Sequence, residues 1–426
     1  MTKIFFQTHG CSTNFSESEV MAGLLAKAGF KITNNKDNAD IIIINICTVK
    51  GETTALKEIR KTKEEFPDKK LIVAGCIPPE ITPKIREINE DTALINTHNI
   101  KRITEVVEET LQDNVIEALT GEDQIKICLP KIRKNPVIGI IPILSGCNSY
   151  CSYCSVKLIK GNLFSYPIEN IIEETKNCLK DGCKEIWITS QDNTSYMLEK
   201  DGISKLSELL NEILKVNGKF FVRIGMMNPQ NILPIIDELI EIYKNEKIFK
   251  FLHIPVQSGN NEILKLMKRG YVVNDFKNII SKFRKEIPNI TISTDIICGF
   301  PTETEQQFND SLNLIKEIKP DIINISKFIA RPGTEAYNLE QLSGEVVKSR
   351  SRLLTGIFHN IARMQNEKWL DWQGNILIDE KGKNESFIGR NLAYKPIIIK
   401  GNFRLGDFVK VKIRAITSFD LRGDVI

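Results

Sequence analysis

The sequence has no long hydrophobic run and no extended apolar start, and each absence excludes a class of protein. Its apolar stretches, such as residues 41–46, have the length of a strand and fall far short of the roughly 18 residues of a membrane helix. The first six residues lead directly into a strand-like segment and lack the apolar region of a signal peptide. We therefore expect a cytoplasmic protein that has no membrane as a partner.

Histidine is also scarce, and no charge of one sign dominates. The four histidines, His9, His98, His253 and His359, are spread along the chain, so no histidine-based metal site is indicated. The chain contains no internal repeat or low-complexity tract, and its 426 residues have the composition of a globular protein of roughly two to four domains. The formal net charge is only +4, and residues 368–426 carry 11 basic against 7 acidic residues, so the small excess lies in this C-terminal part.

The first segment, residues 1–112, alternates strand and helix patterns. Strands are predicted at 3–8, 40–46 and 70–74, with helices at 16–28 and 53–63. Apolar strands that alternate with helices are typical of an open parallel sheet with helices on its faces. Residues 113–136 lose this periodicity and become charged, which indicates a linker.

A second α/β series occupies residues 137–367. Six strands are predicted, at 137–143, 185–190, 220–225, 250–256, 291–297 and 321–329. Six βα units in this length favour a partial parallel barrel, although a doubly wound open sheet would produce the same pattern. A long helix over 344–372 ends this part, and short strands with glycine-containing turns within 368–426 indicate a small antiparallel β-barrel.

The strongest chemical signal is a tight group of three cysteines directly after a predicted strand. Cys147, Cys151 and Cys154 have C-x-x-x-C-x-x-C spacing. Three thiolates in one loop can hold three irons of a 4Fe–4S cubane and leave the fourth iron open for a reactive ligand. The alternative is a structural zinc site made by Cys151 and Cys154 with the distant pair Cys178 and Cys183, which leaves Cys147 without a role.

Three further cysteines share one position relative to the predicted strands. Cys11, Cys47 and Cys76 each follow one of the first three strands. Because the carboxyl ends of parallel strands meet at one edge of a sheet, these thiols are expected to lie together and to hold a second cluster. Alternatively, each is a small core residue. Packing is the expected role of the other four cysteines, Cys128, Cys178, Cys183 and Cys298.

Together these residues resemble the methylthiotransferase family of radical S-adenosylmethionine enzymes over essentially the whole chain. The N-terminal cysteines, the C-x-x-x-C-x-x-C loop and the C-terminal barrel occur in the family's order. The barrel is similar to a TRAM domain, with 387–391 and 406–411 as its recognisable pieces. Two later family motifs are also present, at 294–304 and 331–334.

Three short segments are similar to the archaeal and eukaryotic branch, which acts on threonylcarbamoyladenosine next to the anticodon of tRNA: 47–50, 154–157 and 298–301. Bacterial relatives act on another adenosine derivative or on a ribosomal-protein side chain, and these activities are the first alternative. A second alternative is an iron–sulfur RNA-binding protein without turnover. The family usually has Arg-Gly after the cysteine loop, whereas this chain has Lys160-Gly161, which keeps the charge but loses the planar fork.

The resemblance implies two 4Fe–4S clusters and S-adenosylmethionine as cofactors. The cluster on Cys147, Cys151 and Cys154 would cleave S-adenosylmethionine to a deoxyadenosyl radical, which takes hydrogen from an adenine carbon. The second cluster, on the N-terminal cysteines, would present the sulfur, and another S-adenosylmethionine would supply the methyl group. The implied partners are tRNA, an electron donor and a sulfur source.

Candidate ligand contacts lie at strand ends and on the C-terminal barrel. For S-adenosylmethionine they are Ser190, Gln191, Asp192, Gln257, Ser258 and Asp295, although each would also fit as a hydrogen-bonded polar residue without a ligand. For RNA the barrel offers basic and aromatic side chains, which a solvated barrel face would explain nearly as well: Lys395, Lys400, Arg404, Lys410, Lys412, Arg414, Phe387, Tyr394 and Phe403.

Overall fold

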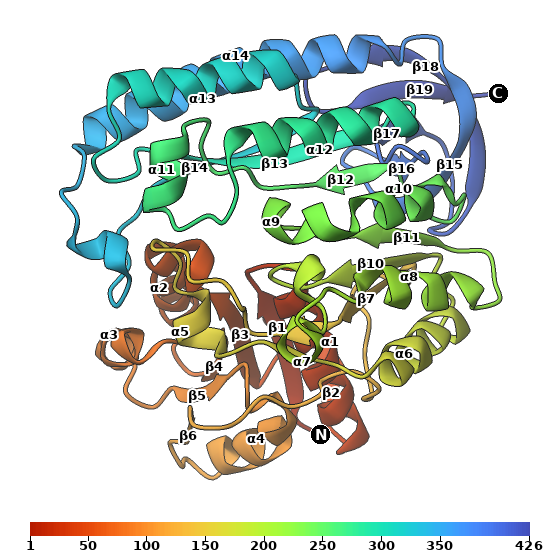
Figure 1. Cartoon of the computed structure of the whole chain (residues 1–426). Coiled ribbons are helices and arrows are strands. Elements are labelled where there is room, and N and C mark those ends of the chain that lie inside the picture. The colour runs from red at the N-terminus through yellow and green to blue at the C-terminus, as the bar shows by residue number, and fades with distance from the viewer.

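The computed structural model describes residues 1–426, apart from the side chain of Lys50. The chain forms an N-terminal α/β unit, a central unit of parallel strands covered by helices, and a small C-terminal β-barrel (Figure 1). None of the described helices combines the length and the apolar character that a membrane crossing requires.

The N-terminal unit is the predicted open parallel sheet, with six strands in the order β2-β1-β3-β4-β5-β6. The strands are β1 (Lys3–Thr8), β2 (Lys31–Thr33), β3 (Ile41–Cys47), β4 (Lys70–Cys76), β5 (Ala93–Asn96) and β6 (Glu117–Ala118). Ile41 and Ile43 pack under α1 (Ser12–Lys27) and α4 (Ile103–Leu111). Ile42, Ile44 and Ile46 point to the other face and pack under α2 (Thr48–Glu65) and α3 (Thr82–Ile88), so β3 is buried on both faces and is apolar almost throughout.

The segment expected to be a linker, 113–136, is bonded to both of its neighbours. Its strand β6 pairs with β5 at the edge of the sheet. Lys126 Nζ lies 3.3 Å from Glu17 Oε1, and Lys131 Nζ lies 2.5 Å from Glu174 Oε1, with all four side chains buried. Lys126 and Lys131, two of the charges that indicated a linker, therefore form buried ion pairs with the N-terminal and central units.

The central unit contains the six parallel strands that the sequence predicts; five are shorter than expected, and the fifth along the chain extends one residue further. β7 (Ile138–Pro142), β10 (Glu185–Thr189) and β11 (Phe221–Ile224) pair with one another, as do β12 (Phe251–His253), β13 (Thr291–Cys298) and β14 (Ile322–Lys327). A bridge from Val222 to Ile248 joins the two groups. No pairing of described residues joins β7 to β14, so the strands form a partial barrel.

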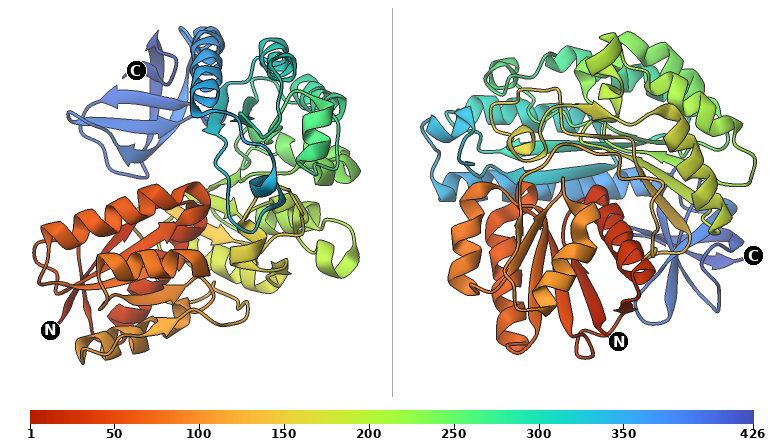
Figure 2. Two further views of the ribbon diagram at one scale, coloured as in Figure 1. Left: turned by 90° about the vertical axis from the view of Figure 1, so that its left-hand side faces the viewer. Right: turned by 90° about the horizontal axis from the view of Figure 1, so that it is seen from below.

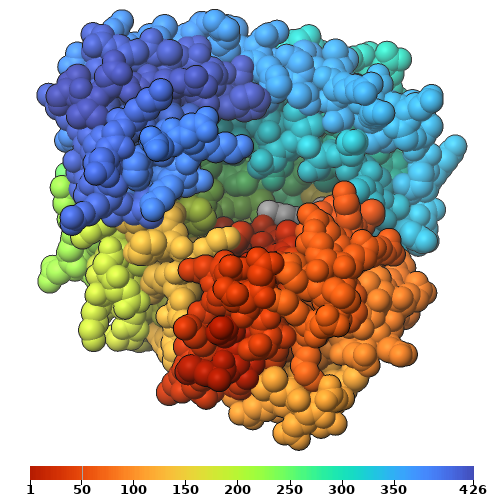
Figure 3. All heavy atoms as spheres, turned by 180° about the vertical axis from the view of Figure 1, so that it is seen from behind, coloured from red at the N-terminus to blue at the C-terminus, as the bar shows by residue number. Residues whose placement is uncertain are grey.

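Helices cover the outside of this partial barrel, and the N-terminal unit lies along its edge. The helices are α6 (Ile168–Lys180), α8 (Leu206–Lys215), α10 (Ile236–Lys244), α12 (Val273–Glu286), α13 (Glu305–Ile318) and α14 (Gly344–Glu367). On the edge strand β7, the Ile140 carbonyl accepts a hydrogen bond from Ser16 of α1 at 3.4 Å. Figure 2 shows the N-terminal unit beside the strands, and Figure 3 shows the surface hollowed between this unit and the C-terminal barrel.

The C-terminal barrel closes in the order β15-β16-β17-β19-β18. Its strands are β15 (Gln373–Lys381), β16 (Ser386–Arg390), β17 (Pro396–Lys400), β18 (Phe408–Ile416) and β19 (Leu421–Val425). Four of the five pairings are antiparallel as predicted, and β17 pairs with β19 in parallel. The small barrel expected from the glycine-containing turns is therefore confirmed.

This barrel docks on the amino ends of the central strands. Lys395 Nζ donates to Asp321 Oδ1 at 2.6 Å, just before β14, and the Tyr394 hydroxyl donates to Glu185 Oε1 at 2.8 Å, at the first residue of β10. Thr291, the first residue of β13, donates to the Ala393 carbonyl at 2.6 Å. Every one of these contacts lies at the end of the central unit where its strands begin.

The docking corrects part of the expected RNA contact set. Lys395 and Tyr394 are only 4% and 7% exposed, because they hold the barrel to the central unit. Phe387 and Phe403 pack edge to face on each other, with ring centroids 5.6 Å apart. Lys412 is paired with Asp371 at 3.0 Å. The three aromatic side chains and Lys395 therefore serve packing, whereas Lys400, Arg404, Lys410 and Arg414 remain exposed.

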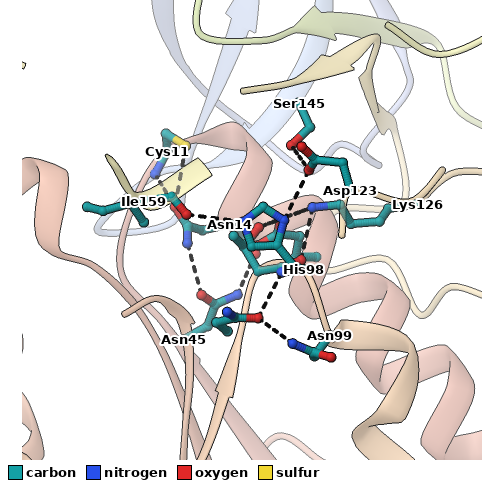
Figure 4. Close-up of polar contacts among 12 residues, drawn as sticks. Cys11, Asn14, Asn45, His98, Asn99, Asp123, Lys126, Ser145 and Ile159 are labelled. Carbon is teal, nitrogen blue, oxygen red and sulfur yellow. Dashed lines mark hydrogen bonds and ion pairs between the residues drawn. The ribbon is translucent and has the colours of Figure 1, made fainter. Parts of the chain in front are cut away.

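A histidine joins the N-terminal unit to the helix that follows the cysteine loop (Figure 4). His98 Nδ1 lies 3.1 Å from Asp123 Oδ1, and Nε2 lies 3.1 Å from the Ile159 carbonyl in α5 (Val156–Lys160). Both partners only accept hydrogen bonds, so the arrangement is satisfied when both ring nitrogens carry a proton. The bond with Asp123 accordingly raises the pKa of His98 above its ordinary value.

We expect this contact to make stability depend on pH. Because the pKa of His98 is raised on folding, its stabilisation is complete below the unfolded value of about 6.5 and is lost as the pH rises through the folded value. In His98→Gln, whose side chain cannot titrate, the melting temperature should fall less steeply as the pH rises over that range. The measurement is thermal unfolding of both proteins at a series of pH values, and identical slopes would contradict the assignment.

Candidate functional site

The three N-terminal cysteines meet at the carboxyl edge of the first sheet. Cys47 and Cys76 end the neighbouring strands β3 and β4 and are direct partners across the sheet. Cys11 lies in the loop between β1 and α1. Interaction with the Cys47 thiol lowers the pKa of Cys11 and of Cys76, and the same two interactions raise the pKa of Cys47.

Two asparagines hold the loops that carry this trio (Figure 4). Asn14 Oδ1 accepts from the Cys11 backbone at 3.2 Å and from its thiol at 3.3 Å, while Asn14 Nδ2 donates to Asn45 Oδ1 at 2.9 Å. Gly75, immediately before Cys76, has φ +105°, and a Cβ there would lie 2.3 Å from Asn45 Oδ1. Only glycine therefore fits between the asparagines and the last residue of β4.

The second trio lies in the loop after β8 (Leu144–Ser145), at the carboxyl end of the partial barrel. The loop is anchored in its middle, where Ser152 Oγ donates to the Leu266 carbonyl at 2.7 Å and the Ser152 carbonyl accepts from Ala336 at 2.8 Å. Burial raises the pKa of Cys147 and raises that of Cys154 to about 12. Deprotonated thiolates at these positions would therefore be stable only beside positive charge.

A cavity of about 300 Å³ adjoins this loop and is lined by all three of its cysteines. Four of the six expected polar contacts also line it, Gln191, Asp192, Gln257 and Asp295. The structure places Ser190 and Ser258 outside this lining: Ser190 donates to Asn193 at 2.9 Å, and Ser258 is fully buried.

Two of the lining carboxylates already have protein partners. Asp192 accepts from Ser195 at 2.7 Å and from Asn231 at 2.8 Å, so it organises the loop after β10. Asp295 contacts His253 Nε2 at 2.8 Å and Asn324 Nδ2 at 2.7 Å. His253 is therefore a hydrogen-bonded residue beside the cavity.

Two arginines at the cavity were not singled out by the sequence. Arg269 Nη1 lies 3.2 Å from the Cys151 sulfur, and its Nη2 lies 3.0 Å from Asn228 Oδ1. Arg331 donates to the Thr48 carbonyl at 2.7 Å and to the Val49 carbonyl, both directly after Cys47. Arg331 begins the motif at 331–334, which was the one available signal.

Arg331 therefore connects the two cysteine loops. It lines the cavity beside Cys154, and Val49 of the N-terminal unit lines the same cavity. The wall of the cavity thus contains residues of both units, and the fork of one guanidinium fixes the loop that follows Cys47 against the barrel.

Lys160 is the second link between the units. It ends α5 and is only 3% exposed. Burial lowers the pKa of Lys160, but the neighbouring thiols of Cys76 and Cys11, together with Glu17, raise it above its ordinary value. The lysine that replaces the family's usual arginine is therefore a buried cation from the barrel beside the N-terminal trio.

The donor sets fit iron–sulfur clusters, in which each thiolate binds a separate iron. No three His, Cys, Asp or Glu side chains among the described residues are arranged to hold a single metal ion. The zinc alternative also lacks its second pair, because Cys178 packs against Gly139 at the start of β7, whereas the cysteine loop follows the other end of that strand. Of the remaining cysteines, Cys128 is exposed, contrary to the expected packing role.

Known families match the chain in three consecutive parts. Residues 3–97 match the Uncharacterized protein family UPF0004, residues 141–315 the Radical SAM superfamily and residues 375–426 the TRAM domain. A probable threonylcarbamoyladenosine tRNA methylthiotransferase of Methanothermobacter thermautotrophicus is 38% identical, and the match covers 99% of each chain. The human threonylcarbamoyladenosine tRNA methylthiotransferase is 37% identical over 100% of this chain and 74% of its own.

Solved structures of similar fold are distant in sequence. The radical S-adenosylmethionine methyltransferase TsrM from Kitasatospora setae superposes with a TM-score of 0.55 at 12% identity, covering 79% of this chain and 75% of its own. The cobalamin-dependent S-adenosylmethionine radical enzyme OxsB superposes with a TM-score of 0.52 at 12% identity, covering 86% and 56%. These likenesses show a shared fold.

We expect Arg331→Met to loosen the loop after Cys47. The change removes two hydrogen bonds, worth about 1 kcal/mol each, so hydrogen exchange in the peptide covering 48–52 should become roughly 30-fold faster. Arg331→Lys keeps the charge but loses the planar guanidinium fork, so its exchange rate should lie between those of the wild type and Arg331→Met. The measurement is exchange followed by mass spectrometry, with a peptide of the C-terminal barrel as internal control. Unchanged exchange in 48–52 would show that Arg331 does not hold the loop.

Proposed function

This chain belongs to the radical S-adenosylmethionine methylthiotransferase family, in its threonylcarbamoyladenosine tRNA methylthiotransferase branch, and on that premise we propose that it attaches a methylthio group to threonylcarbamoyladenosine next to the anticodon of tRNA. One observation carries the proposal. One cavity is lined by all three cysteines of the second trio and by Val49 in the loop after Cys47 of the first trio. Arg331 lines the same cavity and bonds to that loop. Chemistry that needs both sites can therefore take place on one bound nucleoside.

Each trio has a separate role in this proposal. Cys147, Cys151 and Cys154 would hold one 4Fe–4S cluster, and Cys11, Cys47 and Cys76 would hold a second. Together with S-adenosylmethionine, these cofactors supply the one-electron chemistry that reaches an unactivated adenine carbon, which acid–base groups cannot do.

The cavity residues would bind and orient the ligands. Gln191 and Gln257 offer amides to S-adenosylmethionine, and Asp295 is held in place for it by His253 and Asn324. Asp192 would act as a positioning residue, because its oxygens already accept several bonds from the chain. Buried apolar side chains such as Met227 exclude water from the reacting groups.

The units divide the work along the chain. Residues 1–112 would present sulfur, 137–367 would bind S-adenosylmethionine, and 368–426 would contact tRNA, with 113–136 joining the first two. An electron donor and a sulfur source are required as partners. Among the described residues no two cysteines form a disulfide, which fits a reducing compartment such as the cytosol.

Single substitutions in the two trios should separate the two halves of the activity. Cys151→Ala should abolish the release of deoxyadenosine from S-adenosylmethionine, because it removes a ligand of the cleaving site. Cys47→Ala should spare that release and stop methylthiolation, since its loss affects only the site that presents sulfur. The measurement is anaerobic turnover with tRNA, followed by mass spectrometry of nucleosides and of deoxyadenosine.

The same assay separates the alternatives. If the methylthio group is found on another adenosine, or on a ribosomal protein offered in place of tRNA, that molecule is the substrate and the proposed one is wrong. Cluster-replete protein that releases no deoxyadenosine would instead be an RNA-binding protein without turnover. Equal loss of both readouts in Cys47→Ala would contradict separate roles.

Removing the buried charge of Lys160 should weaken the N-terminal site selectively. Lys160→Met takes a cation away from thiols that must be deprotonated to bind iron, so iron content should fall toward that of one cluster. Any N-terminal cluster that remains should be harder to reduce. Lys160→Arg should retain both properties. The measurements are iron and sulfide analysis and a redox titration followed by electron paramagnetic resonance, and a wild-type result for Lys160→Met would refute the electrostatic role.

A further inference from the structure

The part of the chain that resembles an RNA-binding domain lies at the wrong end of the barrel to hold the target nucleotide. The C-terminal barrel docks where the central strands begin (Figure 1), and it does so through contacts to Glu185 and Asp321. The cavity adjoins the loops where those strands end. Each strand residue adds about 3.3 Å, so the two ends are separated by the length of the strands. Side chains that hold the nucleotides flanking the target must therefore lie beside the cavity.

A group of exposed side chains lies there, and we call it the rim: Tyr150, Lys157, Leu158, Ile329 and Tyr337. Tyr150, Leu158 and Ile329 are 70%, 59% and 61% exposed, although all three are large and mostly apolar. Ile329 lines the cavity, as do Ser149 and Cys151 on either side of Tyr150. Such a concentration of exposed apolar side chains beside a binding cavity is typical of an interaction surface.

Backbone and side-chain contacts join the members of the rim. Ala336, next to Tyr337, donates its backbone N–H to the Ser152 carbonyl in the cysteine loop at 2.8 Å. Leu158 of α5 lies against Gly333, so closely that a Cβ added at Gly333 would be 3.0 Å from Leu158 Cδ1. Helix α5 therefore packs on the segment that follows Ile329. The rim is therefore one surface built from the cysteine loop, α5 and the chain after β14.

Tyr150 and Lys157 have the chemistry that recognises a base and its phosphate. Lys157 Nζ lies 3.5 Å from the centre of the Tyr150 ring and covers one face of it. In the part of the chain that the structure describes, no carboxylate forms an ion pair with Lys157 or with the exposed Lys327 at the cavity. An aromatic ring with an adjacent uncompensated cation fits a single-stranded nucleic acid, whose bases stack and whose phosphates are negative.

We propose that the rim binds the single-stranded anticodon loop, with a base next to the target stacked on Tyr150 and its phosphate near Lys157. This inference rests on the proposed function, because it places the RNA whose nucleoside enters the cavity. A protein partner has no regular array of phosphates to pair with Lys157 beside the Tyr150 ring. The charges therefore favour single-stranded RNA as the occupant.

The test compares variants that differ only in the ring. The probe is a synthetic anticodon stem–loop RNA that carries threonylcarbamoyladenosine, with binding followed by fluorescence anisotropy under anaerobic conditions. Tyr150→Leu, which keeps bulk without a π-face, should raise Kd about 5- to 150-fold, the range found for loss of one stacked base. Tyr150→Phe should stay within about twofold of the wild type, because it retains the ring.

Two controls make the result specific to the rim. Phe419→Leu makes the same change at an aromatic side chain of the C-terminal barrel that is 66% exposed, and it should leave Kd for this short RNA unchanged. Lys157→Gln should lower the slope of log Kd against log salt concentration by about 0.7, as expected for one phosphate contact to a single strand. Iron analysis of each variant verifies that the cysteine loop is intact.

A direct readout of stacking completes the design. A fluorescent adenine analogue placed beside the target should be quenched on binding to the wild type and to Tyr150→Phe, but not to Tyr150→Leu. A wild-type protein that neither binds nor modifies the RNA would refute the proposed function itself. Tight binding by Tyr150→Leu with full quenching, or equal losses in Tyr150→Leu and Phe419→Leu, would refute the rim and leave the proposed function standing.

Discussion

In a parallel sheet every strand ends at the same edge, so residues that follow different strands become neighbours without any attraction between their side chains. Both three-cysteine sites depend on this constraint. Cys47 and Cys76 face each other because β3 and β4 are paired in register to their last residues. The loop with Cys147, Cys151 and Cys154 leaves the partial barrel at the edge where Gln191, Gln257 and Asp295 also emerge. Thiols and polar ligand contacts are therefore gathered by backbone pairing.

Two parallel sheets produce one site only if their edges are held together, and buried polar contacts do this. Arg331 binds the carbonyls after Cys47, Lys160 places its charge beside the N-terminal trio, and His98 ties α5 to Asp123. Removing one partner from a buried charge pair is costly, because the other charge is left without compensation. Polar contacts of this kind are directional, so they specify the orientation of the two units in a way that apolar packing alone would not.

The C-terminal barrel has a different relation to the site. It covers the amino ends of the central strands and uses Tyr394 and Lys395 for that purpose. Its remaining surface is far from the cavity along the strands, while exposed aromatic and basic side chains gather at the rim. A division of labour follows, in which the barrel can hold the body of an RNA and the rim can hold the nucleotides around its target.

The sequence by itself determined the parallel class of both sheets and the grouping of six cysteines into two trios, because hydrophobic periodicity and cysteine spacing are local properties. The short strands β2, β5 and β6 were not predicted, since so few residues show no clear periodicity. Only the tertiary structure decided which residues surround the trios. Lys160 and Arg331 are far from Cys11 and Cys47 along the chain, and Lys395 looked like an exposed cation until its partner Asp321 was placed. Ser190 and Gln191 show the same limit at closest range, since Ser190 bonds to Asn193 just after the end of β10 and, of the two, only Gln191 lines the cavity. Contacts between units depend on how the edges of separate sheets meet, and no local pattern records that geometry.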